Sequence, residues 1–311
     1  MKRILLAFGA LLAAAVVLPP LWFAVFPAEP APSLPPAGEQ VLLPGGAAVN
    51  VVAEGSGPVV VLVHGLPGSA YDWRVLAPEL AGRGRRAIAY GRVGYGRSDP
   101  RRDGRYTPEA NAEELLALLE KLDARDATVV GWSYGGVTAI LAAAADPSRI
   151  DRLVLVGSGG PDSPDAEAPE MPLAMRILYS DPVLHWRTAI PPLGIGLMKA
   201  ASQAAFSGQP QPAWWLDGLR ANFSRWDTLI TYRSEMAGVG ADADSPDVFP
   251  ADRIDVPTLI LHGDDDRLAP IAIGRYLHAV IPGSKLVEIP GGSHMLPITH
   301  APLLADRITA F

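Results

Sequence analysis

A serine between two glycines is the strongest chemical signal in the chain. The segment Gly131-Trp132-Ser133-Tyr134-Gly135 has the pattern G-x-S-x-G, and it lies between an apolar run at 127–130 and an Ala-rich helical stretch at 137–145. In such a strand–turn–helix context a serine is held on a sharp turn with its hydroxyl exposed. The N-terminus of the following helix adds positive potential, which stabilises an oxyanion. The pattern predicts a nucleophilic serine, although a Gly-Ser-Gly turn also occurs by chance.

An acidic cluster and a histidine follow in the order that this serine requires. Three consecutive aspartates, 264–266, come after the apolar run 258–261, and His294 comes after the run 285–289. The carboxyl ends of parallel strands lie at one edge of a sheet, where ligands bind. A histidine there can take the serine proton, and a carboxylate can orient the imidazole. The order Ser, Asp, His therefore predicts acyl transfer with Ser133 as the nucleophile.

Metal and cofactor chemistry have no matching motif in the sequence. The chain has no cysteine, which excludes disulfides, thiolate ligands and a cysteine nucleophile. It contains no H-x-x-x-H or H-E-x-x-H pair, no complete dinucleotide fingerprint and no GxxxxGK[ST] loop. We expect no cofactor and no metal, and we expect His64 to hold its loop by hydrogen bonding rather than to react.

The charge balance excludes a nucleic-acid partner. The net charge is −7, and the basic residues do not form a run that could follow a phosphate backbone.

Short apolar runs alternate with helical stretches along most of the chain, which predicts a mostly parallel sheet flanked by helices. The predicted strands are Val59–Val63, Arg86–Tyr90, Ala127–Val130, Arg152–Val156, Thr258–Leu261 and Lys285–Ile289. The alternation breaks between about residues 161 and 250, which are rich in Trp and Met. We expect a helical insertion there, with residues 225–236 returning to the main domain.

These features together resemble the α/β-hydrolase fold family, and within it the cap-bearing serine hydrolases that include epoxide-hydrolase-like and esterase-like members. The similarity spans about residues 39–311. It includes His64-Gly65-Leu66-Pro67-Gly68-Ser69, which is similar to the HGxPG oxyanion loop, and Gly94-Tyr95-Gly96-Arg97-Ser98, which resembles the GxGxS turn. The family commonly has an aspartate shortly before that turn, where this chain has Gly91. The resemblance implies an α/β fold with a mostly parallel eight-stranded sheet and a helical cap, at about 161–240, inserted after the sixth strand.

The resemblance also implies a role for each candidate catalytic residue. Ser133 would be the nucleophile, and His294 would be the general base and then the general acid. The family's spacing places the acid third after a glycine, which favours Asp266 over Asp264, with Asp162 as a more remote candidate.

The oxyanion donors implied by the resemblance are the backbone N–H groups of Leu66 and Tyr134. A serine at the elbow suits attack on a carbonyl, so we expect a carboxylic ester hydrolase that forms an acyl-enzyme. Two alternatives use the same triad: carbon–carbon bond hydrolysis and perhydrolysis. A third alternative, which needs no triad, is a non-catalytic, membrane-tethered binding protein. The aromatic and Met-rich insertion predicts a small to medium, partly hydrophobic substrate.

The N-terminal residues predict a membrane-directing leader. Residues 4–26 carry no charge and follow Lys2 and Arg3, and a helix of that length could cross a bilayer core of about 30 Å. We expect an uncleaved signal anchor, with a cleaved signal peptide as the alternative. Either would place the catalytic domain on the far side of the membrane, periplasmic or extracellular. Residues 27–38, with five prolines, read as an extended linker to the domain at 39–311. No oligomeric state is predicted.

Overall fold

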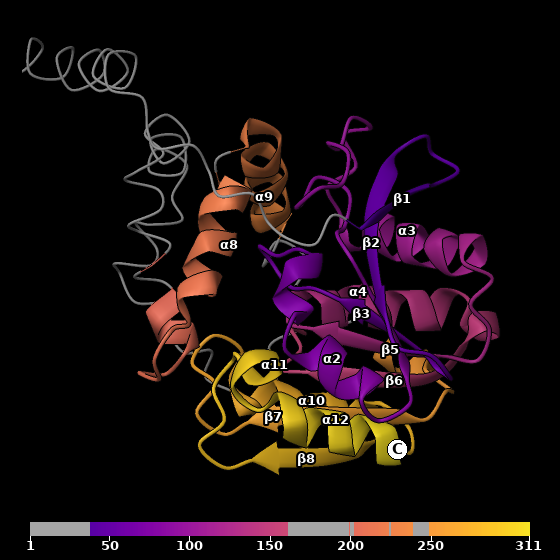
Figure 1. Cartoon of the computed structure of the whole chain (residues 1–311). Helices are drawn as coiled ribbons and strands as arrows, with labels where there is room; N and C mark the ends of the chain where they lie inside the picture. Colours follow the sequence, from indigo (N-terminus) through magenta and orange to yellow (C-terminus); the bar gives the residue numbers. More distant parts are fainter. Residues whose placement is uncertain (1–37, 161–198, 200–201, 224, 239–248) are drawn as a thin grey trace, which may run out of the picture.

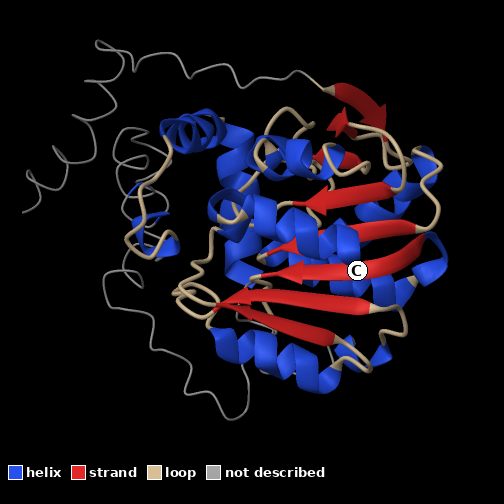
Figure 2. Cartoon of the chain, turned by 60° about the horizontal axis from the view of Figure 1, so that its bottom comes forward, coloured by secondary structure: helices blue, strands red, loops and turns tan. Residues whose placement is uncertain are grey.

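Eight strands form one sheet at the centre of the molecule, in the order β1-β2-β4-β3-β5-β6-β7-β8 (Figures 1 and 2). The computed structural model describes residues 38–160, 199, 202–223, 225–238 and 249–311. The strands are β1 Glu39–Leu42, β2 Ala48–Glu54, β3 Val59–Val63, β4 Arg86–Tyr90, β5 Ala127–Trp132, β6 Ile150–Val156, β7 Thr258–Gly263 and β8 Lys285–Ile289. Strands β1 and β2 run antiparallel to their neighbours, and the other pairs are parallel. The expected mostly parallel eight-stranded sheet is confirmed.

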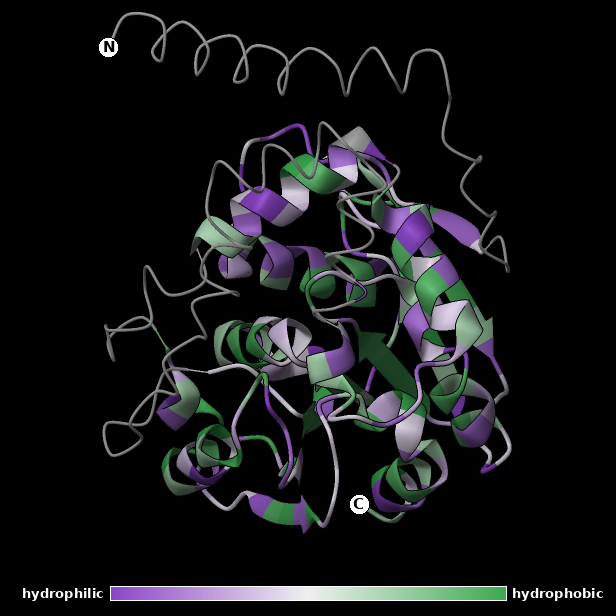
Figure 3. Cartoon of the chain, turned by 90° about the vertical axis from the view of Figure 1, so that its left-hand side faces the viewer, coloured by the Kyte–Doolittle hydropathy of each residue, from purple (hydrophilic) through white to green (hydrophobic). Residues whose placement is uncertain are grey.

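Helices cover both faces of the sheet because successive side chains of a strand point to opposite sides. In β3, Val60 and Leu62 belong to one hydrophobic cluster, and Val61 and Val63 belong to the other. The first cluster includes side chains of α2 (Leu76–Ala81) and α12 (Ala301–Ala310), which follows α11 (Leu296–Thr299). The second includes side chains of α3 (Pro108–Lys121), α4 (Tyr134–Ala145) and α10 (Ile271–Val280). In Figure 3 most of the helices around the sheet carry both hydrophobic and hydrophilic residues, as amphipathic helices do, whereas α4 has no charged residue and is mostly buried.

Local sequence signals fix where several elements begin. Helix α3 starts at Pro108, and its N-cap Thr107 accepts a hydrogen bond from the N–H of Ala110 at 3.3 Å. In the described part of the chain, three short 3₁₀ helices connect larger elements, and they are η1 Ala70–Trp73, η2 Pro147–Arg149 and η4 Ala251–Arg253. The N-terminus of η1 is closed by a capping box between Ser69 and Asp72.

An insertion follows the sixth strand, as expected. Its described part includes α8 (Ala213–Phe223) and α9 (Trp226–Gly238), which lie beside each other at the left of Figure 1. Leu219 of α8 and Tyr232 of α9 are buried in the same cluster as Trp73 and Trp132 of the main domain. The cap helices therefore share a core with the sheet. The limits of the predicted cap at about 161 and 240 lie outside the described residues.

Within the described part of the chain, no helix has the length and apolar character needed to cross a bilayer. The predicted leader, residues 1–26, and all of the predicted linker except Gly38 lie outside that part.

Candidate active site

Ser133 occupies a strained turn between β5 and α4. Its backbone angles are φ +56° and ψ −125°, a combination that costs a non-glycine residue about 1–3 kcal/mol. The turn needs glycine on both sides. A Cβ added at Gly131 would lie 2.6 Å from the Cα of Gly136, and one added at Gly135 would lie 2.2 Å from the carbonyl oxygen of Val63. The two glycines of the G-x-S-x-G pattern thus allow neighbouring backbone segments to lie close together, with Ser133 at the carboxyl end of the sheet.

Asp266 and His294 are in direct contact. Nδ1 of His294 lies 2.8 Å from Oδ2 of Asp266, and Oδ1 of Asp266 accepts hydrogen bonds from the N–H groups of Leu268 at 2.9 Å and Ala269 at 2.8 Å. Burial favours the neutral acid, but the charge and hydrogen bond of His294 and the N–H of Ala269 outweigh it. The pKa of Asp266 is therefore lowered. Asp266 is suited to hold the imidazole ring as a carboxylate.

The neighbouring aspartates have other partners. Asp264 accepts a hydrogen bond from the N–H of Gly291 at 2.7 Å, and Asp265 forms an exposed ion pair with Arg267 at 3.1 Å. Asp266 is thus the member of the triplet that contacts His294. The remote candidate, Asp162, lies outside the described residues.

The end of β6 and the serine turn lie next to this pair. A Cβ added at Gly157 would lie 3.1 Å from Oδ2 of Asp266 and 3.6 Å from Nδ1 of His294. The indole N–H of Trp132 donates to the carbonyl oxygen of His294 at 2.9 Å, and the two rings are 5.9 Å apart. The structure therefore brings the three predicted triad residues to one edge of the sheet, although they are far apart in sequence.

The loop after β3 lies against Ser133. A Cβ added at Gly65 would be 3.0 Å from Cβ and 3.5 Å from Oγ of Ser133, so glycine allows this approach. His64 supports the loop, because its Nδ1 lies 2.9 Å from the carbonyl oxygen of Gly65 and its Nε2 accepts the N–H of Arg92 at 3.0 Å. Burial and the charge of Arg92 hold the pKa of His64 well below its ordinary value, so the ring is neutral. The hydrogen-bonding role expected for His64 is observed.

The two predicted oxyanion donors are the residues that follow Gly65 and Ser133 in sequence. Leu66 follows Gly65 in the loop, and Tyr134 is the first residue of α4, directly after Ser133. Sequence reasoning missed two other side chains at this loop, Arg92 and Glu235. Arg92 lies two residues before the GxGxS turn, which is a local signal, whereas Glu235 belongs to no motif.

The cap contacts the serine turn and the loop that carries the acid. Trp215 of α8 lies 6.3 Å from Trp132 and 6.0 Å from Phe206, measured between ring centroids. The hydroxyl of Ser207 donates to the carbonyl oxygen of Asp265, next to Asp266. Buried aromatic side chains of the cap therefore pack against the serine turn, and Ser207 joins the cap to the loop after β7.

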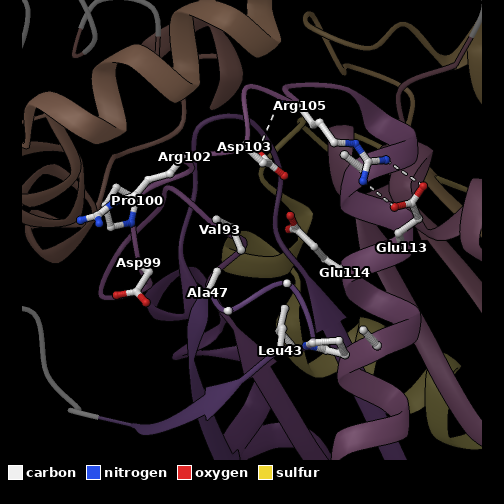
Figure 4. A pocket seen from close by; sticks show the side chains of 15 residues that line it. Leu43, Ala47, Val93, Asp99, Pro100, Arg102, Asp103, Arg105, Glu113 and Glu114 are labelled. Atoms are coloured by element: carbon white, nitrogen blue, oxygen red, sulfur yellow. Dashed lines mark hydrogen bonds and ion pairs between the residues drawn. The ribbon is translucent and has the colours of Figure 1, made fainter.

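A separate cavity of about 390 Å³ lies beside α3, between the β1–β2 turn and the loop 99–105 (Figure 4). None of the three predicted triad residues lines it. Two of its charged side chains, Arg105 and Glu113, are paired with each other at 2.8 Å. Among the residues that the structure describes, no group of three or more potential ligands could hold a metal ion.

The chain belongs to the α/β-hydrolase fold family, whose model matches residues 58–301. It is 30% identical over 250 residues to a non-heme chloroperoxidase from Kitasatospora aureofaciens, which covers 77% of this chain and 86% of that protein. It is 28% identical over 265 residues to a bifunctional esterase/perhydrolase from Acinetobacter calcoaceticus, covering 82% and 91%.

Further similarity is found to a 2-hydroxymuconate semialdehyde hydrolase from Pseudomonas sp. (strain CF600), which is 34% identical over 140 residues, 44% of this chain and 49% of that protein. Among solved structures, an esterase from Exiguobacterium antarcticum superposes with a TM-score of 0.71 at 22% identity, over 88% of this chain and 98% of that one. The relatives are hydrolases of this fold, and the chain is a hydrolase of the same family.

Proposed function

We propose that the protein is a serine hydrolase that cleaves a carboxylic ester or a similar acyl compound through an acyl-enzyme on Ser133. The observation that carries this proposal is the strained turn at Ser133 beside the hydrogen-bonded pair of His294 and Asp266. When Nδ1 of a histidine is bonded to a carboxylate, Nε2 is the nitrogen that can take the serine proton, as a general base requires.

In the acylation step, Oγ of Ser133 attacks the substrate carbonyl while Nε2 of His294 takes its proton. Asp266 stabilises the imidazolium that forms. The negative charge develops on the carbonyl oxygen, where the N–H groups of Leu66 and Tyr134 donate to it. Collapse of this intermediate breaks the ester C–O bond, and His294 returns the proton to the leaving alcohol.

In the second step, His294 takes a proton from water as the water oxygen attacks the acyl carbonyl. The C–O bond to Ser133 then breaks, the serine recovers its proton, and the carboxylic acid leaves. Both steps use a hydroxyl nucleophile on a carbonyl carbon, which is the reaction for which a serine with a histidine base is suited.

The proposed substrate is small to medium and partly hydrophobic. Support comes from the aromatic side chains of the cap, Trp215 and Phe206, which pack toward Trp132 beside Ser133. Apolar surface over a few polar groups is the usual composition of a small-molecule site.

A fluorophosphonate probe tests the nucleophile directly. We expect it to label the folded protein at Ser133, as mapped by mass spectrometry, and to stop hydrolysis of p-nitrophenyl esters in proportion to labelling. The Ser133→Ala variant is the control and should take up no label. Active protein that stays unlabelled would overturn the proposal, and so would labelling at another residue.

Carbon–carbon bond hydrolysis and perhydrolysis are the second candidate. They are favoured by two relatives that are named as a semialdehyde hydrolase and an esterase/perhydrolase. In perhydrolysis, hydrogen peroxide replaces water in the attack on the acyl-enzyme and releases a peracid. A panel of p-nitrophenyl esters, a dienone-type substrate, and acetate with hydrogen peroxide separates the three by their kcat/KM. Folded protein that takes up no label and is inactive on every member would favour the binding-protein alternative.

A further inference from the structure

A completely buried ion pair lies behind the predicted oxyanion loop. Nη1 of Arg92, just after β4, is 2.7 Å from Oε1 of Glu235 on α9, and neither side chain is exposed. The same carboxylate accepts hydrogen bonds from the hydroxyl of Tyr95 at 2.6 Å and from the amide of Asn111 at 2.8 Å. Burial alone would lower the pKa of Arg92, but the charge of Glu235 raises it above the ordinary value. Arg92 is therefore a permanent buried cation.

Arg92 holds one specific peptide group of the loop. Its Nη2 donates to the carbonyl oxygen of Gly65 at 3.0 Å, and Nδ1 of His64 donates to the same oxygen at 2.9 Å. The carbonyl of Gly65 and the N–H of Leu66 belong to one planar peptide unit, in which they point in opposite directions. Two donors on the carbonyl therefore fix the direction of the Leu66 N–H.

The guanidinium also touches the second predicted oxyanion donor. Its central carbon lies 4.8 Å from the ring centroid of Tyr134 and 4.7 Å from that of Tyr95. A cation over an aromatic face is attracted by the ring. Arg92 thus contacts the peptide that carries one donor and the residue that carries the other.

Stability alone does not account for such a pair. Replacing a buried ion pair by neutral side chains of similar volume is often neutral or stabilising, because two charges lose their hydration on burial. We propose that Arg92 and Glu235 are positioning residues, which orient the Leu66 N–H toward the developing oxyanion, and that cap helix α9 thereby helps to form the oxyanion hole. This inference rests on the proposed serine-hydrolase function.

The test replaces both charges together, so that neither is left buried without a partner. In the double variant Arg92→Met/Glu235→Gln, the glutamine can still bond Asn111 and Tyr95, but the Gly65 carbonyl loses its cation. The matched control is Arg101→Met/Glu114→Gln. Arg101, which is buried, and Glu114, which is partly buried, form a second ion pair, 2.6 Å apart, in which Arg101 donates to Asn111 rather than to Gly65.

We expect the Arg92/Glu235 double variant to lose about 10- to 100-fold in kcat with KM unchanged within about twofold, because oxyanion donors act in the transition state. The control variant should keep its kcat. Amide hydrogen exchange of the segment containing Leu66, followed by mass spectrometry, should become faster in the first variant only. Equal losses in both variants, or unchanged kcat and exchange in the first, would overturn the inference.

Failure of the proposed function has a different signature. Wild-type protein would then show neither hydrolysis nor labelling of Ser133, whereas the exchange measurement would still report whether Arg92 and Glu235 hold the loop. If the double variant does not fold, Arg92→Lys provides the same comparison, since it keeps the charge beside Glu235 but not the forked contact with Gly65.

Discussion

Ser133 combines the proposed chemistry with a backbone conformation that stability alone would not favour. Glycine populates such angles freely, whereas any side chain is strained there. The turn persists because the backbone around it is tightly held, with the N–H of Ser133 bonded to Val156 and its carbonyl bonded to the N–H of Gly136. The sequence could predict this serine because the glycines that the turn requires leave a local pattern.

Replacing Ser133 by glycine should therefore stabilise the protein while it abolishes activity. We expect Ser133→Gly to raise the free energy of unfolding by about 1 kcal/mol, after the entropic cost of glycine is subtracted from the relieved strain. Urea denaturation at constant m-value measures this. The Ser133→Ala variant, which keeps a Cβ at the same angles, is the matched control and should show no such gain.

The choice among the three aspartates can be tested by single amide substitutions. Asp266→Asn should reduce kcat by about 10³–10⁴-fold, as loss of the orienting carboxylate does in other serine triads, while the fold is retained. Asp264→Asn, two residues earlier in the same loop, should leave kcat within about twofold, because exposed substitutions of this kind have small effects. Equal losses of kcat in the two variants would contradict the assignment of Asp266, rather than Asp264, as the acid of the triad.

Asp72, at the far end of the oxyanion loop, should make stability depend on pH. Burial raises the pKa of Asp72 to about 7, despite the hydrogen bonds from Ser69. The folded state then binds a proton that the unfolded chain has already released between about pH 4 and 7. As the pH rises from about 4 to 7, the free energy of unfolding of the wild type should therefore fall by up to about 4 kcal/mol relative to that of Asp72→Asn. Thermal unfolding at pH 4, 5.5 and 7.5 measures the difference, and a parallel pH dependence in both proteins would contradict it.

The strands were predictable to the extent that each carries a continuous apolar or β-branched run, which in β3, β5 and β7 is buried on both sides of the sheet. All six apolar runs identified from the sequence form parallel strands, whereas β1 and β2 were implied by the family resemblance alone. Strand β1 is mostly exposed and begins with Glu39 and Gln40, so it has no continuous apolar run to detect. The pairing of Arg92 with Glu235 was not predictable, because the two residues are 143 positions apart and nothing near Glu235 indicates a partner.

Close packing between elements predicts which glycines tolerate a side chain. Gly135→Ala should lower the free energy of unfolding by more than about 2 kcal/mol, because its Cβ would collide with the backbone of β3, which cannot move aside as a side chain can. Gly45→Ala is the control, since a Cβ at Gly45 meets nothing within 4 Å. Chemical denaturation of both variants measures the difference, and similar stabilities would contradict this account of the elbow.

For the whole molecule, we propose that residues 1–26 anchor the protein in a membrane, with the hydrolase domain on its far side. The proposal comes from the uncharged stretch after Lys2 and Arg3. Expressed in a bacterium, the full chain should remain in the membrane fraction after alkaline carbonate extraction, and added protease should reach the domain only from the outer side. Recovery of a shortened chain in the soluble fraction would favour the cleaved signal peptide instead.

The position of β1 has a mechanical consequence. It is one of the two edge strands of the sheet and pairs with β2, in the register Glu39–Val51 to Leu42–Ala48. The chain enters the sheet through it. A pull on the N-terminal end would load the hydrogen bonds of this one strand before those of any other. Strand β1 could peel away and re-form while β5, β7 and β8, which carry the predicted triad, remain unloaded. Under such a pull, strand β1 would detach first, and the strands that carry the predicted triad would keep their hydrogen bonds.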